Sequence, residues 1–182
     1  PINLTHTHSL PSMYTYSTQP KGEMAGQLQV NYTIPKGTAL GGKYGTKLAF
    51  NMSQVNDIVR DSVQYGNTMA LNQTGTLGYT SKFFAISDHR FFRDINFEVD
   101  KKINKNWHLT AQYINLYYDI ETIEGHAGSP VVKANIGVMD LTYKFKRQSL
   151  RLELQGLWEN EVHKGYEEEE SEKKDYQKRG EW

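Results

Sequence analysis

The sequence predicts an all-β protein, an antiparallel up-and-down transmembrane β-barrel with long outer loops, of which about six spanning strands lie in this chain. Two observations predict this fold. Apolar and polar residues alternate with a period of two, as in strands that have one apolar and one wet face. The segments between the strands alternate between short and long, as do the turns and outer loops of bacterial outer-membrane barrels. We therefore expect residues 1–182 to form a single partial barrel domain, a fragment of a longer protein.

The amino-acid composition fits the wall of a transmembrane β-barrel. Aromatic residues make up 12% of the chain, with 12 Tyr, 7 Phe and 3 Trp, although the hydrophobic fraction is only 37% and the mean hydropathy is −0.69. A barrel shows lipid only alternate residues and borders its apolar band with aromatic girdles. The same composition also suits a soluble, secreted β-sandwich that binds carbohydrate, which remains the alternative.

Charge and cysteine content exclude several classes of protein. The 21 basic and 21 acidic residues balance, whereas a general nucleic-acid binder has an excess of Lys and Arg. The absence of cysteine excludes a disulfide framework, a thiolate nucleophile and a cysteine metal site. No run of about 20 apolar residues suggests a spanning helix.

The alternation predicts three hairpins. In the first, the pattern is strict over 27–34 and resumes at Tyr44, after turn formers between Pro35 and Gly42. The strands and turns of the other two are 95–103, 104–106 and 107–113, and then 135–145, 146–149 and 150–158. With six strands the segment is too short to close, because the smallest single-chain outer-membrane barrels use eight. We therefore expect the first and last strands to pair with strands from elsewhere.

The two sides of each strand have different expected environments. The residues expected to face lipid are Leu28, Val30, Tyr32, Leu48, Phe50, Phe97, Val99, Leu109, Tyr113, Leu141, Leu152 and Leu154. The residues expected to face the barrel interior are Gln29, Asn31, Asn51, Glu98, His108, Gln112, Arg151 and Glu153.

The connections should sort by length onto opposite ends of the barrel. The short joins are 35–43, 104–106 and 146–149, and the long polar ones are 55–91, 120–132 and 159–179. The last is predicted to be a charged outer loop, since the acidic run 167–175 has no apolar partner. Asp61-Ser62-Val63, in the first long loop, resembles a short O-glycosylation signal in which Ser62 would be the modified residue. Basic residues collect at the short joins: Lys36, Lys43, Lys101, Lys102, Lys105, Lys146 and Arg147.

Histidines are candidates for a metal site, but their pattern is weak. His6 and His8 lie on one side of an extended segment, a geometry that chelates zinc or copper, yet no third ligand is near in the sequence. His126 lies in a glycine-containing outer loop and His108 on the polar side of a strand. A turn and a hydrogen-bonding role explain these two, so we predict no metal and no cofactor.

Candidate catalytic groups are similarly weak. Ser87-Asp88-His89 has the residue types of a triad, but triad members converge from separate parts of a fold. Glu98, Asp100 and Glu153 share the polar side and resemble a glycosidase pair, although a solvated wall explains them. We therefore predict no catalytic residue and no enzyme activity.

Several short motifs resemble a known family. They are Pro1-Ile2-Asn3-Leu4-Thr5-His6, Gly22-Glu23-Met24, Tyr32-Thr33-Ile34-Pro35-Lys36-Gly37, Leu40-Gly41-Gly42-Lys43-Tyr44-Gly45-Thr46 and Glu124-Gly125-His126-Ala127-Gly128. The chain resembles, over most of 1–160, a family of outer-membrane β-barrel proteins of unknown function from Bacteroidota-type bacteria. The resemblance implies the fold and a location in the bacterial outer membrane, and it gives no site residues.

Together these observations predict a non-enzymatic outer-membrane barrel that acts as a channel, an uptake accessory or a subunit of an envelope complex. The expected partners are outer-membrane lipid and the remainder of the same chain or other envelope proteins. A glycan or a small solute is a possible ligand, and nucleic acid is not expected.

Overall fold

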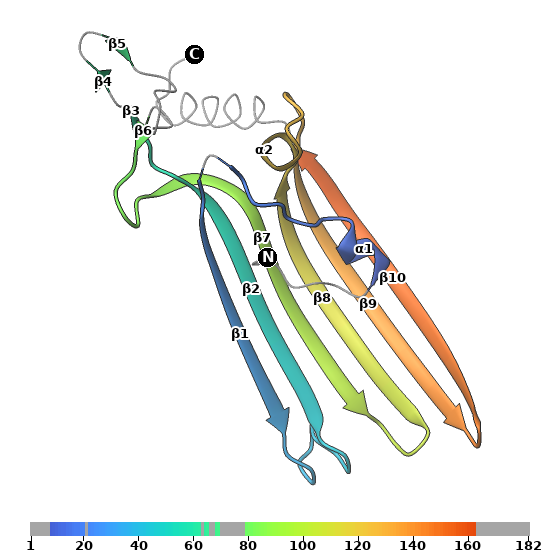
Figure 1. Ribbon diagram of the computed structural model, residues 1–182. Helices are drawn as coiled ribbons and strands as arrows, with labels where there is room; N and C mark the ends of the chain where they lie inside the picture. Colours follow the sequence, from blue (N-terminus) through green and yellow to red (C-terminus); the bar gives the residue numbers. More distant parts are fainter. Residues whose placement is uncertain (1–7, 21, 63, 66–67, 70–78, 163–182) are drawn as a thin grey trace, which may run out of the picture.

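A computed structural model describes residues 8–20, 22–62, 64–65, 68–69 and 79–162. One antiparallel sheet of six strands dominates it (Figure 1). In their order across the sheet, the strands are β1 (Met24–Ile34), β2 (Thr46–Ile58), β7 (Ile86–Lys102), β8 (Trp107–Asp119), β9 (Val131–Phe145) and β10 (Gln148–Val162). Each strand pairs with the next long strand of the chain, so the predicted all-β, up-and-down meander is confirmed.

The remaining elements are small. They are the helices α1 (Ser9–Ser12) and α2 (Ile120–Glu124) and the two-residue strands β3 (Asp61–Ser62), β4 (Gln64–Tyr65), β5 (Thr68–Met69) and β6 (Tyr79–Thr80). Helix α2 begins where the Asp119 side chain accepts a hydrogen bond from the Thr122 amide, and it ends at Gly125, whose φ of 77° is easily adopted by glycine.

The connections sort by length, as predicted. The short joins, 35–45, 103–106 and 146–147, lie at one end of the sheet, which we call the turn end (Figure 1). The described parts of the two long connections, 59–62, 64–65, 68–69 and 79–85 in the first and 120–130 in the second, lie at the other, the loop end. This arrangement follows from the antiparallel pairing of consecutive strands.

The long strands extend further than the alternation indicated. Strand β2 continues to Ile58, inside the expected loop 55–91, and β10 continues to Val162, inside the expected charged loop 159–179. The sequence missed these ends because both faces carry mixed residues there, which weakens the period of two. The acidic run 167–175 and the side chain of Ser62 lie outside the described residues.

The register divides the sheet into two faces. Phe50 pairs with Phe97, which pairs with Tyr113, on what we call the apolar face. Asn51 pairs with Asn96, which in turn pairs with Ile114, on the opposite face. Every residue expected to face lipid lies on the apolar face, and every residue expected to face the interior lies on the other. The predicted separation of side chains is therefore correct.

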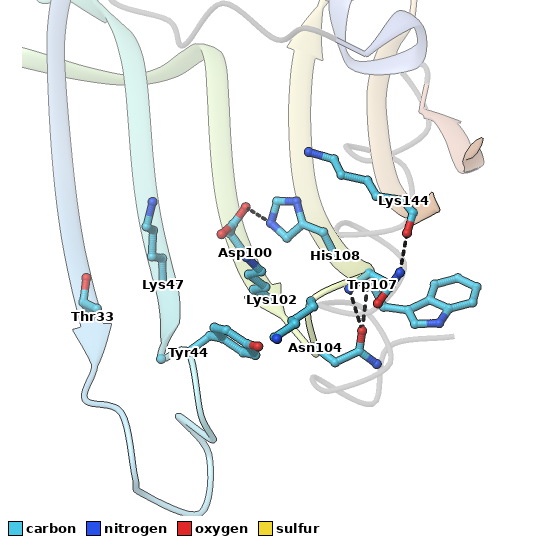
Figure 2. A pocket seen from close by; sticks show the side chains of 12 residues that line it. Thr33, Tyr44, Lys47, Asp100, Lys102, Asn104, Trp107, His108 and Lys144 are labelled. Atoms are coloured by element: carbon cyan, nitrogen blue, oxygen red, sulfur yellow. Dashed lines mark hydrogen bonds and ion pairs between the residues drawn. The ribbon is translucent and has the colours of Figure 1, made fainter. Parts of the chain in front are cut away.

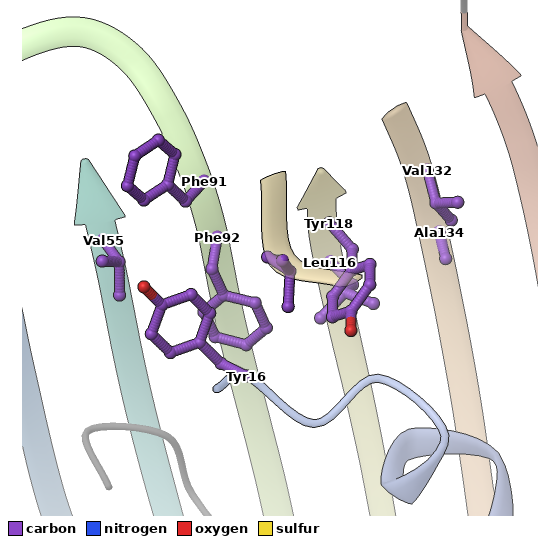
Figure 3. Packing of buried hydrophobic residues seen from close by; sticks show 9 residues of the cluster. Tyr16, Val55, Phe91, Phe92, Leu116, Tyr118, Val132 and Ala134 are labelled. Carbon is purple, nitrogen blue, oxygen red and sulfur yellow. The ribbon is translucent and has the colours of Figure 1, made fainter. Parts of the chain in front are cut away.

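The face opposite the apolar face is covered in part by residues 8–20, and we call it the covered face. The sequence predicted a polar face along its whole length. Towards the loop end, however, the covered face is apolar. Tyr16, on the N-terminal segment, lies 5.4 Å between ring centroids from Phe92 and packs in a cluster of buried side chains (Figure 3). A second cluster contains Ile114, Ile136 and Val138. The N-terminal segment covers these apolar side chains and shields them from water.

The apolar face has no such cover within the described residues. Many of its large side chains are exposed, from one edge strand to the other, including Tyr32 at 60%, Phe97 at 44% and Leu154 at 51%. An exposed apolar surface that crosses a whole sheet is unusual for a soluble monomer and indicates an apolar environment or partner.

Candidate functional site

Charged side chains gather on the covered face towards the turn end, where they form cross-strand pairs. His108 Nε2 lies 2.9 Å from the Asp100 carboxylate, which Thr110 also contacts at 3.4 Å. Two strands away, Arg151 donates hydrogen bonds to Asp140 at 2.6 Å and to Glu153 at 3.0 Å. The acids of this region are thus engaged with a histidine, a hydroxyl and a guanidinium.

A hollow of about 410 Å³ lies at the turn end of this face (Figure 2). Its wall comes from β1, β2, β7, β8 and β9 and from the turns between them. The charged side chains in its lining are Lys47, Lys102, Lys105, Lys144 and Asp100. The ammonium of Lys102 lies 4.9 Å from the centroid of the Tyr44 ring, a cation–π distance. The hollow is therefore polar and predominantly basic.

The N-terminal segment is anchored to β10 on the covered face. Gln155 Oε1 accepts from the Leu10 amide at 3.0 Å, and Tyr14 donates its hydroxyl to Glu159 at 2.9 Å. His8 Nδ1 lies 3.2 Å from Glu153. Sequence reasoning missed this segment, because its apolar residues show no period of two; the tyrosines among polar residues were the only signal.

Two tyrosines of this segment have raised pKa values. Burial, together with the hydrogen bond to the Glu159 carboxylate, raises the pKa of Tyr14 to about 12. Burial also raises the pKa of Tyr16, whose hydroxyl donates to Glu23. Both phenols therefore remain neutral donors at physiological pH, and their role is to hold the segment in place.

A second polar cluster lies at the loop end. His89 Nε2 lies 2.9 Å from Asp119, a fully buried carboxylate, and Nδ1 lies 3.9 Å from Asp57. Arg60 forms an ion pair with Asp57 at 2.6 Å and donates to the Gly22 carbonyl. These contacts tie the start of β7 to the ends of β2 and β8, so the cluster has a structural explanation.

The structure does not assemble a triad from Ser87-Asp88-His89. The Ser87 hydroxyl accepts from the His89 backbone amide at 3.2 Å, while the imidazole is turned towards Asp119. The serine therefore lacks the contact with a general base that a nucleophile requires. The glycine-rich segment 41–45 forms the end of the β1–β2 turn.

The candidate metal residues are likewise separate. His6 lies outside the described residues, and His126 is 3.7 Å from Glu124 alone. Within the described part of the chain no three His, Cys, Asp or Glu residues form a group that fits a metal. Of the three candidate glycosidase acids, Glu98 and Asp100 lie two residues apart on the covered face of β7, and Glu153 lies apart from them. Asp100 and Glu153 lie on β7 and β10, with two strands between them, and each already has a basic partner.

Comparison with known proteins gives a family and no activity. A family model described as a family of unknown function, DUF6029, matches residues 1–174. The chain belongs to DUF6029. No curated protein and no solved structure matches it. In the described residues of this DUF6029 chain, no helix is long and apolar enough to cross a membrane.

Proposed function

We propose that this DUF6029 chain forms part of the wall of a bacterial outer-membrane β-barrel and has no enzyme activity. Such a barrel acts as a channel, an uptake accessory or a subunit of an envelope complex. The observation that carries the proposal is the exposed apolar face, which extends from β1 to β10, while the chain's own N-terminal segment packs on the opposite face. This is the distribution expected if lipid contacts one face and a lumen the other.

The dimensions of the apolar face support a bilayer as its environment. Leu150 and Trp158 lie on β10 at positions about 27 Å apart along a strand. At the strand tilt of about 40° typical of barrels this is about 21 Å of depth, close to the roughly 25 Å height of a barrel's apolar band.

Aromatic rings border this band at both ends. Trp107 and Tyr143 pack at the turn end with centroids 4.6 Å apart, and Phe145 stacks beyond them at 6.5 Å from Tyr143. Trp158, which is 66% exposed, lies towards the loop end. Aromatic girdles at the two membrane interfaces have this arrangement.

Closure of the wall requires further strands. Strands β1 and β10 are the two edges of the sheet, and each pairs with one neighbour among the described residues. An unpaired backbone N–H or C=O costs several kcal/mol in hydrocarbon, so an open edge does not persist in a bilayer. We expect the remainder of the same polypeptide or another envelope protein to supply the missing strands.

The alternative, a soluble carbohydrate-binding β-sandwich, needs a second sheet packed on the apolar face. Among the described residues, the segment 8–20 packs on the sheet, and it lies on the covered face. This favours the barrel, because a sandwich buries its most apolar face first.

A single-cysteine scan tests the proposal directly, because the chain contains no cysteine of its own. Nitroxide labels are placed one at a time at Leu28, Phe97 and Leu152 of the apolar face, and at Gln29 and Glu98 of the covered face. The protein, with the rest of its chain, is reconstituted into phospholipid vesicles. Collision of each label with oxygen, which concentrates in lipid, is compared with collision with a water-soluble nickel chelate.

The barrel predicts that labels on the apolar face collide with oxygen and are protected from nickel, while labels at Gln29 and Glu98 show the reverse. Labels at Leu28, Phe97 and Leu152 that are protected from both reagents in detergent-free, soluble protein would establish the sandwich instead. The period of two serves as the internal control, since adjacent positions differ only in the face they occupy.

A further inference from the structure

The hollow at the turn end contains lysines without acidic partners. Lys47, Lys105 and Lys144 line it, and none of them forms an ion pair with a described residue. Asp100 lies directly opposite Lys47 in the register, but its carboxylate contacts His108 and Thr110 instead. The hollow therefore holds an excess of positive charge that the described residues do not neutralise.

The other basic residues of the turn end do not contribute to this hollow. Lys101 lies on the apolar face and donates to the Leu40 carbonyl at 2.9 Å. Lys146 lies 5.3 Å from the centroid of the Phe145 ring and is not among the residues that line the hollow. The lysines that line the hollow thus form a group distinct from the other basic residues of the turn end. Lys102 belongs to this group and lies over the Tyr44 ring.

Like charges held around one concave surface repel each other and reinforce the local potential. An anion among them relieves the repulsion and accepts charge-assisted hydrogen bonds from the ammonium groups within its reach. Rings of Lys and Arg select anions and phosphate in known pores by the same principle. The hydroxyl of Thr33, also in the wall of the hollow, adds a neutral donor.

We infer that this hollow, lined by Lys47, Lys102, Lys105 and Lys144, is a binding site for a small oxyanion of the phosphate class. The site goes beyond the proposed function, because binding the anion does not require that the apolar face contact lipid. It contains no catalytic step: the anion is held by electrostatic attraction and hydrogen bonds. In a closed barrel the site would lie at the turn-end mouth of the lumen.

Inorganic phosphate is the probe. Its binding to the purified full-length protein is measured by calorimetry at constant ionic strength, set with chloride. The test variant is Lys47→Gln with Lys102→Gln. The matched control is Lys146→Gln with Arg147→Gln, which removes the same charge from the same end of the sheet but outside the hollow. Circular dichroism establishes that each variant retains its β structure.

The test variant should bind phosphate about tenfold or more weakly, since each lost charge-assisted hydrogen bond contributes on the order of a factor of ten. The control should stay within about twofold of the original protein. Equal losses in both variants would mean a general charge effect and overturn the site, as would the absence of saturable phosphate binding in the unaltered protein. If the test variant does not fold, Lys105→Gln in the turn replaces it, with the same expected direction.

The conservative variant Lys47→Arg with Lys102→Arg provides a further check. It keeps both charges, so phosphate affinity should recover to near that of the original protein. Failure of this pair to bind, despite an intact sheet, would contradict an electrostatic site. The vesicle experiment on the apolar face is independent of these measurements, so either proposal can fail without the other.

Discussion

The backbone amide of Leu10 donates a hydrogen bond to Gln155 Oε1 at 3.0 Å, joining residues 145 positions apart. Gln155 also contacts the Ser9 hydroxyl through both of its polar atoms. The Gln155 side chain, on the covered face of β10, thus forms hydrogen bonds with the first two residues of helix α1. This contact positions the N-terminal segment over the sheet, where Tyr14 and Tyr16 complete the apolar clusters.

The variant Gln155→Ala should loosen the N-terminal segment. The Leu10 amide and the Ser9 hydroxyl lose their acceptor, at a cost of about 1 kcal/mol for the segment's docking. Hydrogen exchange of residues 9–16 should therefore become faster, while exchange in β8 should not change. Gln148→Ala, at the turn end of the same strand, is the control. Unchanged exchange in 9–16 would mean that the tyrosines alone hold the segment.

Leu152→Arg should destabilise the protein in lipid by about 2–4 kcal/mol if this position faces the bilayer centre. Leu152 is 50% exposed on the apolar face, so the cost comes from the charge in hydrocarbon and not from lost packing. The measurement is a denaturant titration of folding into vesicles. Gln29→Arg, on the opposite face of an edge strand, should be nearly neutral. Equal stability of the two variants would count against a lipid environment for Leu152.

Gly41→Ala should destabilise the β1–β2 turn. A Cβ at this position would lie 2.0 Å from the Pro35 carbonyl oxygen and 2.7 Å from Thr38 Oγ1, so the turn backbone must shift. Overpacking of this kind typically costs about 1–3 kcal/mol. The free energy of unfolding, measured in denaturant, should fall accordingly.

Gly26→Ala is the matched control for Gly41, since a Cβ there meets no heavy atom within 4 Å. It should be neutral or stabilising by about 0.5–1 kcal/mol, because alanine has less freedom than glycine in the unfolded chain. A stable Gly41→Ala variant would mean that the turn adopts another conformation.

Tyr14 should ionise near pH 12 and not near 10. Its pKa is raised by burial and by the Glu159 carboxylate, so folding favours the neutral phenol. The stabilisation is therefore complete below the unfolded pKa of about 10 and is lost as the pH rises towards 12. The check is the difference in tyrosinate absorbance between the original protein and Tyr14→Phe. In Glu159→Gln the midpoint should fall but stay above 10; a midpoint of 10 in the original protein would contradict the anchoring of this segment.

The alternation of side chains was sufficient to predict the strands, the short turns and the face on which each strand residue lies. Leu28 and Gln29, for example, were placed on opposite faces correctly, because consecutive side chains in a strand always point to opposite sides. The sorting of loops by length followed from the same assignment. These features are local, so the sequence carries them directly.

The covered face was predicted only in part. Glu98 and Gln112 lie there, as expected, but its apolar half around Ile136 was missed. That half depends on a segment more than a hundred residues away in the chain, docked through Gln155. The periodicity of the sequence does not predict a contact between segments so far apart in the chain.

The sequence by itself determined that this chain is a meander of six amphipathic strands, because hydrophobic periodicity and turn residues act over a few neighbouring positions. Only the tertiary structure decided which cations share the basic hollow, since Lys47, Lys102 and Lys144 come together through the register of separate strands. It also decided that Asp100 bonds to His108 and not to the lysine opposite it. The physical reason is that charge pairing depends on distances across strands, which only the assembled sheet fixes.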